Sequence, residues 1–209
     1  MDWTALYLKT SGLKVFILGT GEVATRRANK FLDHGAVVRL AGSSISQNLK
    51  EKGAELHSTD DVDDLVEWAD LVVVASGDEK LSDYVGRISE GKLVNRADFP
   101  YEGDVIVPTS FNIADIEISI FTNGKSPLMA RQLRKKIQSV ITEEDILEIE
   151  LQDYSRSILK KIIPDQKERR KYLYKIFEDE NILKLIKSGE IDKAKAVINE
   201  SIKRDFNDT

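Results

Sequence analysis

The chain has 209 residues, of which 41% are hydrophobic and 32% are charged, as in globular proteins with one sizeable core and room for a smaller second domain. A net charge of −5 argues against general binding to nucleic acid, and the absence of cysteine excludes disulfides, thiolate metal sites and cysteine nucleophiles. No apolar run is long enough to span a membrane, and the N-terminal residues lack the features of a signal peptide, so we expect a cytoplasmic protein.

The N-terminal half of the chain alternates short apolar runs with amphipathic segments. The apolar runs predict strands at residues 14–18, 36–41, 54–57, 71–75 and 92–95. The segments between them predict helices at residues 22–33, 46–52, 60–68 and 78–90. Because strands that alternate with helices form right-handed βαβ units, we predict a Rossmann-like parallel sheet.

The pattern changes after about residue 100. Residues 105–108 and 116–121 are typical of strands with no helix between them, and the second run alternates as in an antiparallel pair with one solvated face. Ser126-Pro127 begins a long helix, because Ser suits the N-cap and Pro the first helical position. From residue 142 onward only helical segments follow, interrupted at Pro164 and Gly189. The sequence thus predicts an α/β protein with a central α+β region and a small all-helical C-terminal domain.

A glycine motif follows the first predicted strand. Gly19-Thr20-Gly21-Glu22-Val23-Ala24 has the G-x-G-x-x-A form and opens a helix. In such a motif Gly19 allows a tight turn, Gly21 lets the backbone approach a pyrophosphate and Ala24 packs closely on the strand. The first helical turn, with Glu22 and Val23, offers N–H groups and the positive end of the helix dipole to phosphates. The competing interpretation is a glycine turn that only closes a strand-helix corner.

The second strand lacks the acidic residue that usually holds the ribose of NAD. It ends Arg39-Leu40-Ala41-Gly42-Ser43-Ser44, in which Ser43 offers a weaker contact. Arg39 is compatible with a 2′-phosphate but also with a place in solvent, so these residues leave NAD and NADP open. Ser76 and Gly77 follow the fourth strand and are further candidates for cofactor contact. A plain strand-to-helix turn explains them equally well.

Two stretches are strongly basic in spite of the acidic whole. Residues 131–136 read Arg-Gln-Leu-Arg-Lys-Lys, and residues 167–175 hold five Lys or Arg side chains. Local basic surfaces can therefore coexist with an acidic whole. The favoured interpretation of both runs is a solvated helix face.

Three ordered stretches resemble the precorrin-2 dehydrogenases, including the bifunctional dehydrogenase/ferrochelatases and the dehydrogenase module of siroheme synthases. The stretches run from Val15 to Arg27, from Val94 to Asp98 as an N-x-x-D segment, and from Thr122 to Arg131 as a G-x-S-P-x-x-A-R segment. The resemblance extends from about residue 12 to the C-terminal helices. It implies oxidation of precorrin-2 to sirohydrochlorin with NAD, a reaction of siroheme biosynthesis.

The resemblance also implies an architecture of three regions in an intertwined homodimer. These are an NAD-binding domain at residues 1–112, a dimerisation region at 113–145 and a helical domain at 146–209. The chain is too short to include the methyltransferase domain of trifunctional siroheme synthases.

Oxidation of a reduced macrocycle removes a hydride and protons, so a carboxylate that accepts a proton is expected at the carboxyl end of the sheet. Asp98 follows the fifth strand and matches the family's functional aspartate, which makes it the predicted catalytic residue. A turn aspartate before Phe99-Pro100 is the alternative interpretation, and Asp104 is a second candidate base.

Tetrapyrroles of this class carry acetate and propionate groups, which need cationic or N–H partners. The predicted substrate-binding residues are Asn95, Lys125, Ser126, Arg131 and Arg134. Ser126 has two credible roles, as the N-cap of a helix and as a contact to a substrate carboxylate. The two arginines are equally consistent with a solvated face or a dimer contact.

No set of His and Cys residues is available to hold a permanent metal, and both histidines, His34 and His57, are expected to be structural. Insertion of Fe²⁺ as a substrate would use similar proton chemistry, and the sequence leaves that activity open. A non-enzymatic NAD-sensing regulator would share the glycine motif and the βαβ series. It does not account for the segments around Asp98 and Ser126, so it is the alternative.

Overall fold

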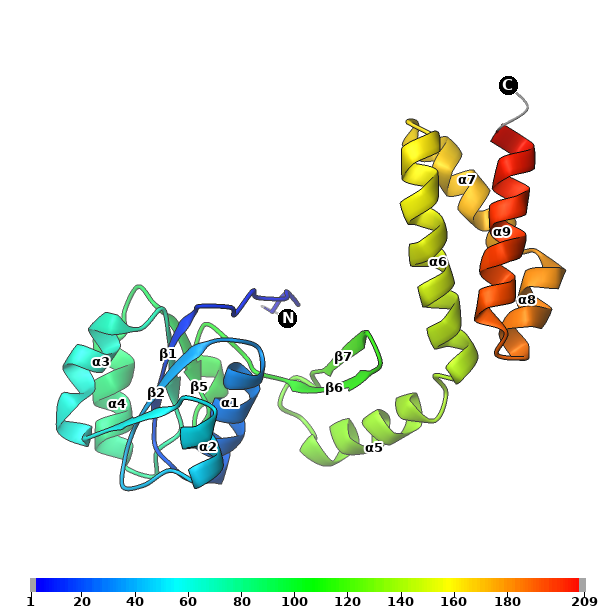
Figure 1. The fold of residues 1–209 in the computed structure, drawn as a ribbon. Helices are drawn as coiled ribbons and strands as arrows, with labels where there is room; N and C mark the ends of the chain where they lie inside the picture. The colour runs from blue at the N-terminus through cyan, green and yellow to red at the C-terminus, as the bar shows by residue number, and fades with distance from the viewer. Residues whose placement is uncertain (1–2, 207–209) are drawn as a thin grey trace. The chain divides into compact units, whose positions relative to one another are not determined.

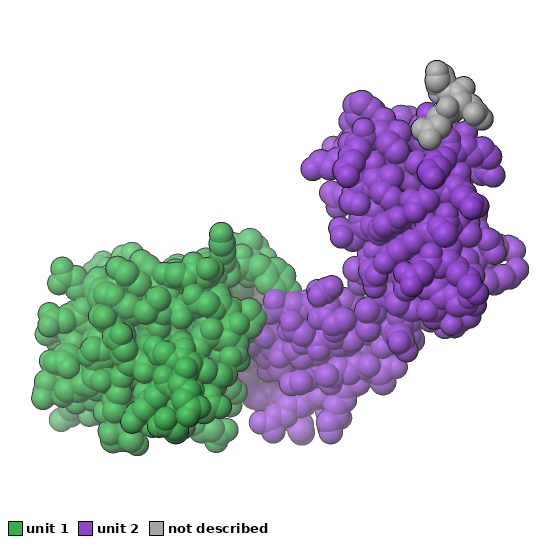
Figure 2. Space-filling model, in the orientation of Figure 1, with its two compact units in different colours: residues 1–107 green, residues 108–209 purple. Residues whose placement is uncertain are grey.

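The computed structural model describes residues 3–206 and divides into two compact units, with the boundary between Val107 and Pro108 (Figure 2). Each unit has its own buried core. The three-region division with a boundary at residue 112 stays a prediction, since it concerns dimerisation as well as compactness.

The first unit is built on a sheet of five parallel strands in the order β3-β2-β1-β4-β5 (Figure 1). The strands are β1 (Lys14–Leu18), β2 (Val37–Ala41), β3 (Glu55–His57), β4 (Leu71–Val74) and β5 (Leu93–Arg96). This order reverses between β1 and β4, where doubly wound sheets place their ligands at the carboxyl ends of the strands.

Helices cover both faces of this sheet. Along β1, Val15 and Ile17 pack into one core with α1 (Glu22–Asp33) and α2 (Gln47–Glu51). The intervening Phe16 and Leu18 pack into the opposite core with α3 (Val62–Trp68) and α4 (Glu79–Ile88). Figure 1 shows α1 and α2 on one side of the sheet and α3 and α4 on the other. Because both faces are buried, the central strands β1 and β4 are apolar at successive positions from Val15 and Leu71 onward and show no alternation. The predicted Rossmann-like sheet is therefore confirmed.

The second unit begins with an antiparallel hairpin, β6 (Thr109–Ile113) and β7 (Ile116–Ile120), beside α5 (Pro127–Gln138). The predicted strand at residues 105–108 is wrong, because the hairpin starts only at Thr109. Val105 instead donates its N–H to Val94 O at the edge of β5, and Val107 packs against the core on the α1 side. The apolar run reflects this packing, not strand pairing with β7.

Four helices complete the second unit: α6 (Glu143–Ile162), α7 (Gln166–Phe177), α8 (Glu180–Lys187) and α9 (Ile191–Phe206). Leu151 and Leu159 of α6 pack against Ile186 of α8 and Ile198 of α9. The expected breaks occur, with Pro164 between α6 and α7 and Gly189 at φ 72° before α9. The predicted fold class is thus confirmed, including its helical C-terminal part.

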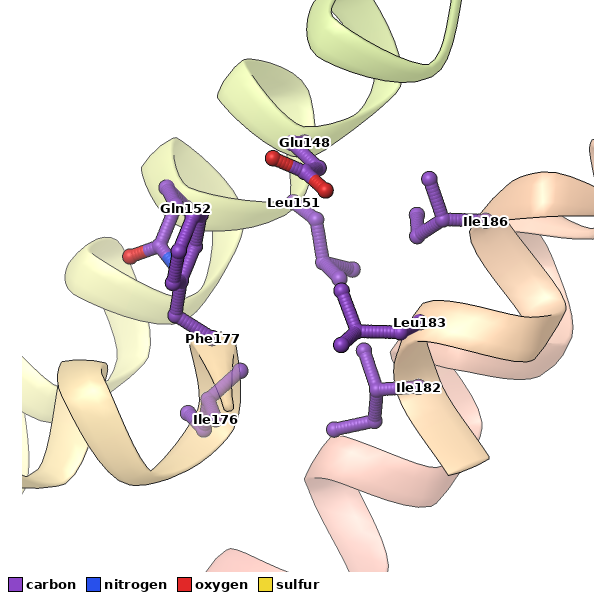
Figure 3. Close-up of a pocket in the computed structure, with 8 residues that line it drawn as sticks. All are labelled: Glu148, Leu151, Gln152, Ile176, Phe177, Ile182, Leu183 and Ile186. Carbon is purple, nitrogen blue, oxygen red and sulfur yellow. The ribbon is translucent and has the colours of Figure 1, made fainter. Parts of the chain in front are cut away.

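A small apolar pocket lies among α6, α7 and α8, lined by Leu151, Ile176, Ile182 and their neighbours (Figure 3). Its volume of about 10 Å³ is no more than a single water molecule needs. It is a packing defect of the helical core and holds no site. Within residues 3–206 no helix combines the length and hydrophobicity needed to cross a bilayer.

Candidate nucleotide and substrate site

The turn after β1 is tight and can be formed only by glycine. Gly19 has a φ of 108°, and a Cβ at this position would lie 2.3 Å from Ala75 O, the carbonyl that follows β4. Its N–H donates to Ala41 O at the end of β2. Gly19 therefore joins the carboxyl ends of three neighbouring strands.

Two other glycines are not required by the protein itself. Of the twelve glycines, seven have a positive φ, and Gly42, Gly86 and Gly103 have neighbours that a Cβ would strike. Only Gly21 and Gly77 have neither property, and a Cβ at either position would meet no atom within 4 Å. They follow β1 and β4, which are adjacent in the sheet. Their lack of side chains thus leaves open space at the point where the strand order reverses, as a bound dinucleotide requires.

The first turn of α1 is open in the same place. Its N-cap is Gly21, which provides no side-chain acceptor for the first-turn N–H groups. The side chain of Glu22 is 93% exposed, and its nearest ion-pair partner is Arg26 at 3.6 Å. The Glu22 side chain therefore does not cover the start of the helix. Val23 is exposed as well, whereas Ala24 is fully buried against the sheet. This arrangement fits a phosphate group, since free N–H groups and the helix dipole both favour an anion.

The end of β2 is organised by contacts that the sequence pattern missed. Thr20 Oγ1 lies 3.5 Å from Ser43 Oγ, and a Cβ on Gly42 would come within 2.6 Å of the Thr20 side chain. Gly42 therefore lets Thr20 pack across the loop. Arg39 donates to Glu55 Oε2 at 2.8 Å and lies 4.2 Å above the Trp68 ring, so its charge is already compensated.

The loop after β4 is shaped by side chains. Ser76 Oγ accepts the N–H of Asp78 at 3.1 Å, and Asp78 Oδ1 accepts the N–H of Leu81 at 3.0 Å as the N-cap of α4. Gly77 lies exposed between them. Ser76 thus stabilises the turn that presents Gly77.

Asp98 is held by an arginine that the sequence analysis had not singled out. Arg96 Nε donates to Asp98 Oδ1 at 2.9 Å and Nη2 donates to Oδ2 at 2.8 Å, a bidentate pair. The Arg96 side chain is only 6% exposed, and it also meets Asp83 at 3.1 Å and Glu102 at 3.4 Å. A Cβ on Gly86 would lie 2.9 Å from Arg96 Nη1, so this glycine makes room for the guanidinium. In the sequence, only the position of Arg96 at the end of a strand, two residues before Asp98, could have indicated this pair.

The pairing sets the ionisation of Asp98. Partial burial by itself raises the pKa of Asp98, but hydrogen bonds from Arg96 and from the backbone N–H groups of Phe99 and Asp98 outweigh it. The net result is a pKa below the usual value for aspartate. The hydrogen bond to Asp98 likewise raises the pKa of Arg96. Asp98 is therefore a fixed, ionised carboxylate at neutral pH.

Asn95 lies beside this pair on β5 and is 2% exposed. Its Nδ2 donates to Val105 O at 2.7 Å, while its Oδ1 is buried and has no hydrogen-bond partner in the described part of the chain. The N–H of Asp104 donates to Val94 O at 2.8 Å. Asn95 thus fastens Val105 to the edge of β5, Val94 O fastens Asp104, and Asn95 Oδ1 remains an unused acceptor.

The remaining predicted substrate residues belong to the second unit. Ser126 Oγ accepts the N–H of Met129 at 3.1 Å as the N-cap of α5, and Thr122 Oγ1 in turn donates to Ser126 O at 3.2 Å. The Arg134 guanidinium lies 5.1 Å from the Phe111 ring. Lys125 and Arg131 have no ion-pair partner among residues 3–206. The predicted residues therefore fall into two groups, one in each unit.

Both histidines have local partners. His34 Nδ1 lies 2.7 Å from Lys30 O near the end of α1, and His57 Nε2 lies 3.4 Å from Glu55 Oε2. The described residues contain no group of three or more His, Asp or Glu side chains placed to hold a metal ion.

The sheet, the Gly19 turn and the open first turn of α1 define a dinucleotide-binding α/β protein. A family model described as "Putative NAD(P)-binding" matches residues 6–109, which contain this site. The fold and the match together define the class as NAD(P)-binding.

Sequence relatives define the family. Precorrin-2 dehydrogenase of Methanosarcina barkeri is 32% identical over 194 residues, which cover 87% of this chain and 85% of that protein. Siroheme synthase of Pseudomonas paraeruginosa is 27% identical over 97% of this chain, which matches 44% of that protein. The solved structure of SirC, precorrin-2 dehydrogenase, superposes with a TM-score of 0.76 over 95% of this chain and 100% of that one, at 21% identity. The chain belongs to the precorrin-2 dehydrogenase family and is an oxidoreductase.

Proposed function

We propose that the protein oxidises precorrin-2 to sirohydrochlorin with NAD as the oxidant, a step of siroheme biosynthesis. The relatives named for this substrate and pathway support the proposal. The observation that carries it is the pair Gly21 and Gly77, since neither glycine is needed by the backbone or by a neighbouring atom. A dinucleotide lying across the ends of β1 and β4 explains both.

The residues at the end of β2 favour NAD over NADP. A 2′-phosphate needs a free cation near this position, and Arg39 is occupied by Glu55 and Trp68. Ser43 is exposed and offers only a hydroxyl. Hydroxyl groups of an unphosphorylated ribose match that environment better than a phosphate does.

In the proposed mechanism, Asp98 takes the proton. When bound, the nicotinamide ring supplies the hydride acceptor. The macrocycle that has lost a hydride is acidic, so even a carboxylate with a lowered pKa is basic enough to deprotonate it. Arg96 fixes both Asp98 oxygens by its bidentate pair and keeps the carboxylate ionised before the reaction. Arg96 is thus a positioning residue.

We assign the acetate and propionate groups of the substrate to Lys125, Arg131, Arg134 and the Ser126 end of α5. Two of these cations have no internal partner, which leaves their charges available. We leave Asn95 out of this assignment, because its unused Oδ1 is a buried acceptor and lies on the opposite face of β5 from Arg96. Insertion of Fe²⁺ into the product would release pyrrole N–H protons, and Asp98 is the carboxylate that could accept them.

We also propose that the hairpin and α5 form a homodimer interface. Among the twelve residues of α5 only Ala130 is buried, while Met129 and Leu133 are 50% and 37% exposed. In the hairpin only Phe111 is buried. A two-stranded hairpin beside one helix has little core of its own, so a second copy supplies the missing burial.

The test is an anaerobic incubation of the purified protein with precorrin-2 and NAD⁺, in which NADH and sirohydrochlorin are followed spectroscopically. We expect the two products to form together, and Asp98→Asn to lower kcat by roughly a hundredfold or more while NAD⁺ affinity stays unchanged. The thermal midpoint of Asp98→Asn and its NAD⁺ titration are the controls for folding and for the cofactor site. Normal turnover by Asp98→Asn contradicts the assigned base. NAD⁺ binding without any oxidation by the wild type would favour the NAD-sensing regulator.

A further inference from the structure

A strongly basic stretch of the chain lines a cleft in the helical part of the second unit. Residues 156–171 contain seven Lys or Arg and two Asp or Glu side chains, a net charge of +5 in a chain whose net charge is −5. Neither the nucleotide site nor the assigned substrate residues use this stretch.

The cleft lies between α6 and α7, which meet at Pro164. Its volume is about 300 Å³, and it is lined by Arg156, Lys160, Gln166, Arg169, Arg170 and Leu173. We call these residues the basic cleft. Its lining includes four cations and one apolar side chain but no carboxylate.

Two of the cations are held in place by neutral groups. Arg169 Nη1 donates to Ile163 O at 2.6 Å and to Pro164 O at 2.7 Å. Arg170 lies 5.6 Å from the Tyr174 ring and reaches its hydroxyl at 3.4 Å. These contacts fix the two guanidinium groups without cancelling their charges.

The other two cations, Arg156 and Lys160, have no ion-pair or hydrogen-bond partner in the described part of the chain. Arg156 forms no ion pair even with Asp153, which lies three residues before it on α6. On the other side of the cleft, Glu168 pairs with Lys171 at 2.8 Å and Asp165 caps α7. Elsewhere in this unit, cations do find acids, as Lys195 does with Glu150 at 2.6 Å. Four like charges that converge without an acid repel one another, and a bound anion relieves this repulsion.

We propose that the basic cleft binds a small organic molecule that carries several carboxylates. Four separate cations fit a polycarboxylate better than a single phosphate, and guanidinium groups bind carboxylates through two parallel hydrogen bonds. Leu173 gives the cleft an apolar wall for the body of such a ligand. Tetrapyrroles with acetate and propionate groups are the polycarboxylates that the proposed function supplies, and in this identification the inference rests on that function. The volume suits one carboxylate-bearing edge of the macrocycle.

The experiment measures binding of uroporphyrin, a stable tetrapyrrole with acetate and propionate groups, by calorimetric titration of the full-length protein. The test variant is the double substitution Arg156→Glu and Lys160→Glu. The control is Lys184→Glu with Lys203→Glu, which makes the same charge change at exposed positions of α8 and α9 in the same unit. We expect the test variant to lose one equivalent of bound uroporphyrin, or to bind it at least tenfold more weakly, and the control to match the wild type.

Three outcomes overturn the inference. They are equal uroporphyrin binding by the wild type and the test variant, an equal loss in the control variant, and displacement of uroporphyrin by duplex RNA whose own binding the test variant abolishes. NADH formation from precorrin-2 is measured on the same samples, so the two proposals fail separately. Wild-type turnover with unaltered uroporphyrin binding in the test variant removes the basic cleft alone. Charge-dependent uroporphyrin binding without turnover leaves the cleft in place and removes the proposed reaction.

Discussion

The two units of the chain differ in the way that one helix, α1 of the first unit, begins. In the second unit α5, α6, α7 and α8 each start at a Ser, Thr or Asp whose side chain accepts a first-turn N–H. In the first unit α2 and α4 are capped by Ser46 and Asp78 in the same manner. The N-cap of α3 makes no such bond, but α3 continues a helical turn at residues 59–61 whose start is capped by Ser58. In contrast, α1 starts at Gly21 with no side-chain cap at its entry. Since a cap stabilises a helix by about 1 kcal/mol, its absence at the glycine turn marks a helix start that a ligand completes.

The units also differ in how much of their surface is already buried. The sheet of the first unit has a core on each face. The hairpin and α5 of the second unit bury little beyond Phe111 and Ala130. The first unit is closed apart from its open glycine turn, where we propose that the nucleotide binds, whereas α5 leaves apolar side chains exposed, where we propose that a second copy binds.

The largest expected effect separates two glycines of one turn. Gly21→Asp should weaken NAD⁺ binding on the order of a hundredfold or more, because it places a carboxylate where the pyrophosphate approaches, and it should leave folding intact because the position faces open space. Gly19→Ala should instead destabilise the fold by a few kcal/mol. Its Cβ would collide with Ala75 O, and the backbone at this position has a positive φ that alanine rarely adopts. Thermal midpoints and NAD⁺ titrations of both variants check this. Unaltered NAD⁺ affinity in Gly21→Asp would place the nucleotide elsewhere.

The next effect concerns the exposed apolar face of α5. The double variant Met129→Glu and Leu133→Glu should convert a dimer into a monomer, because the two side chains lie one turn apart on the same face. Sedimentation equilibrium measures the mass, with Gln138→Glu on another part of the helix as the control. A wild-type protein that is monomeric at all concentrations contradicts the proposed interface.

A smaller effect appears as the pH falls. Asp98 has a pKa below its usual value, and hydrogen bonds from Lys175 and then Tyr172 lower the pKa of Asp205 to about 2. A folded-state pKa below the unfolded value stabilises the protein above the ordinary pKa of aspartate, and this stabilisation is lost as the pH falls through the folded pKa. Asp98→Asn and Asp205→Asn should therefore lower the thermal midpoint near pH 7, and the differences from the wild type should shrink as the pH falls from about 4, the ordinary pKa of aspartate, toward the Asp205 pKa of about 2. The measurement is the thermal midpoint of the wild type and the two variants as a function of pH. A difference in midpoint that stays constant with pH would mean that the two carboxylate charges do not contribute to stability.

The smallest effect tests the cap of α5. Ser126→Ala should cost about 1 kcal/mol of stability by removing the acceptor for Met129 N–H. If Ser126 also contacts a substrate carboxylate, KM for precorrin-2 should rise while kcat stays constant. Ser126→Asp, which keeps a cap but adds negative charge, should restore stability and raise KM further. Unchanged KM in both variants would leave Ser126 with the structural role alone.

The amino-acid sequence by itself determined the parallel sheet, because runs such as Leu71–Val74 are apolar at every position and alternate with amphipathic helices. It also determined the glycine turn, because the G-x-G-x-x-A motif stands directly after the first strand. The φ of 108° at Gly19 is one that favours glycine. The strand predicted at residues 105–108 was wrong, because a half-buried apolar coil has the same local pattern as a strand.

Only the tertiary structure decided which candidates have which neighbours. The sequence pattern did not indicate Arg96, because its role depends on the pairing with Asp98 and on the space that Gly86 leaves for its guanidinium. Gly86 lies on α4, whereas Arg96 lies on β5. Arg39 looked available until Glu55 and Trp68 were brought to it by β3 and α3. The basic stretch looked like a solvated helix face until α6 and α7 folded its charges around one cleft. Local pattern fixes backbone conformation, whereas the pairing and burial of charges depend on contacts between distant residues.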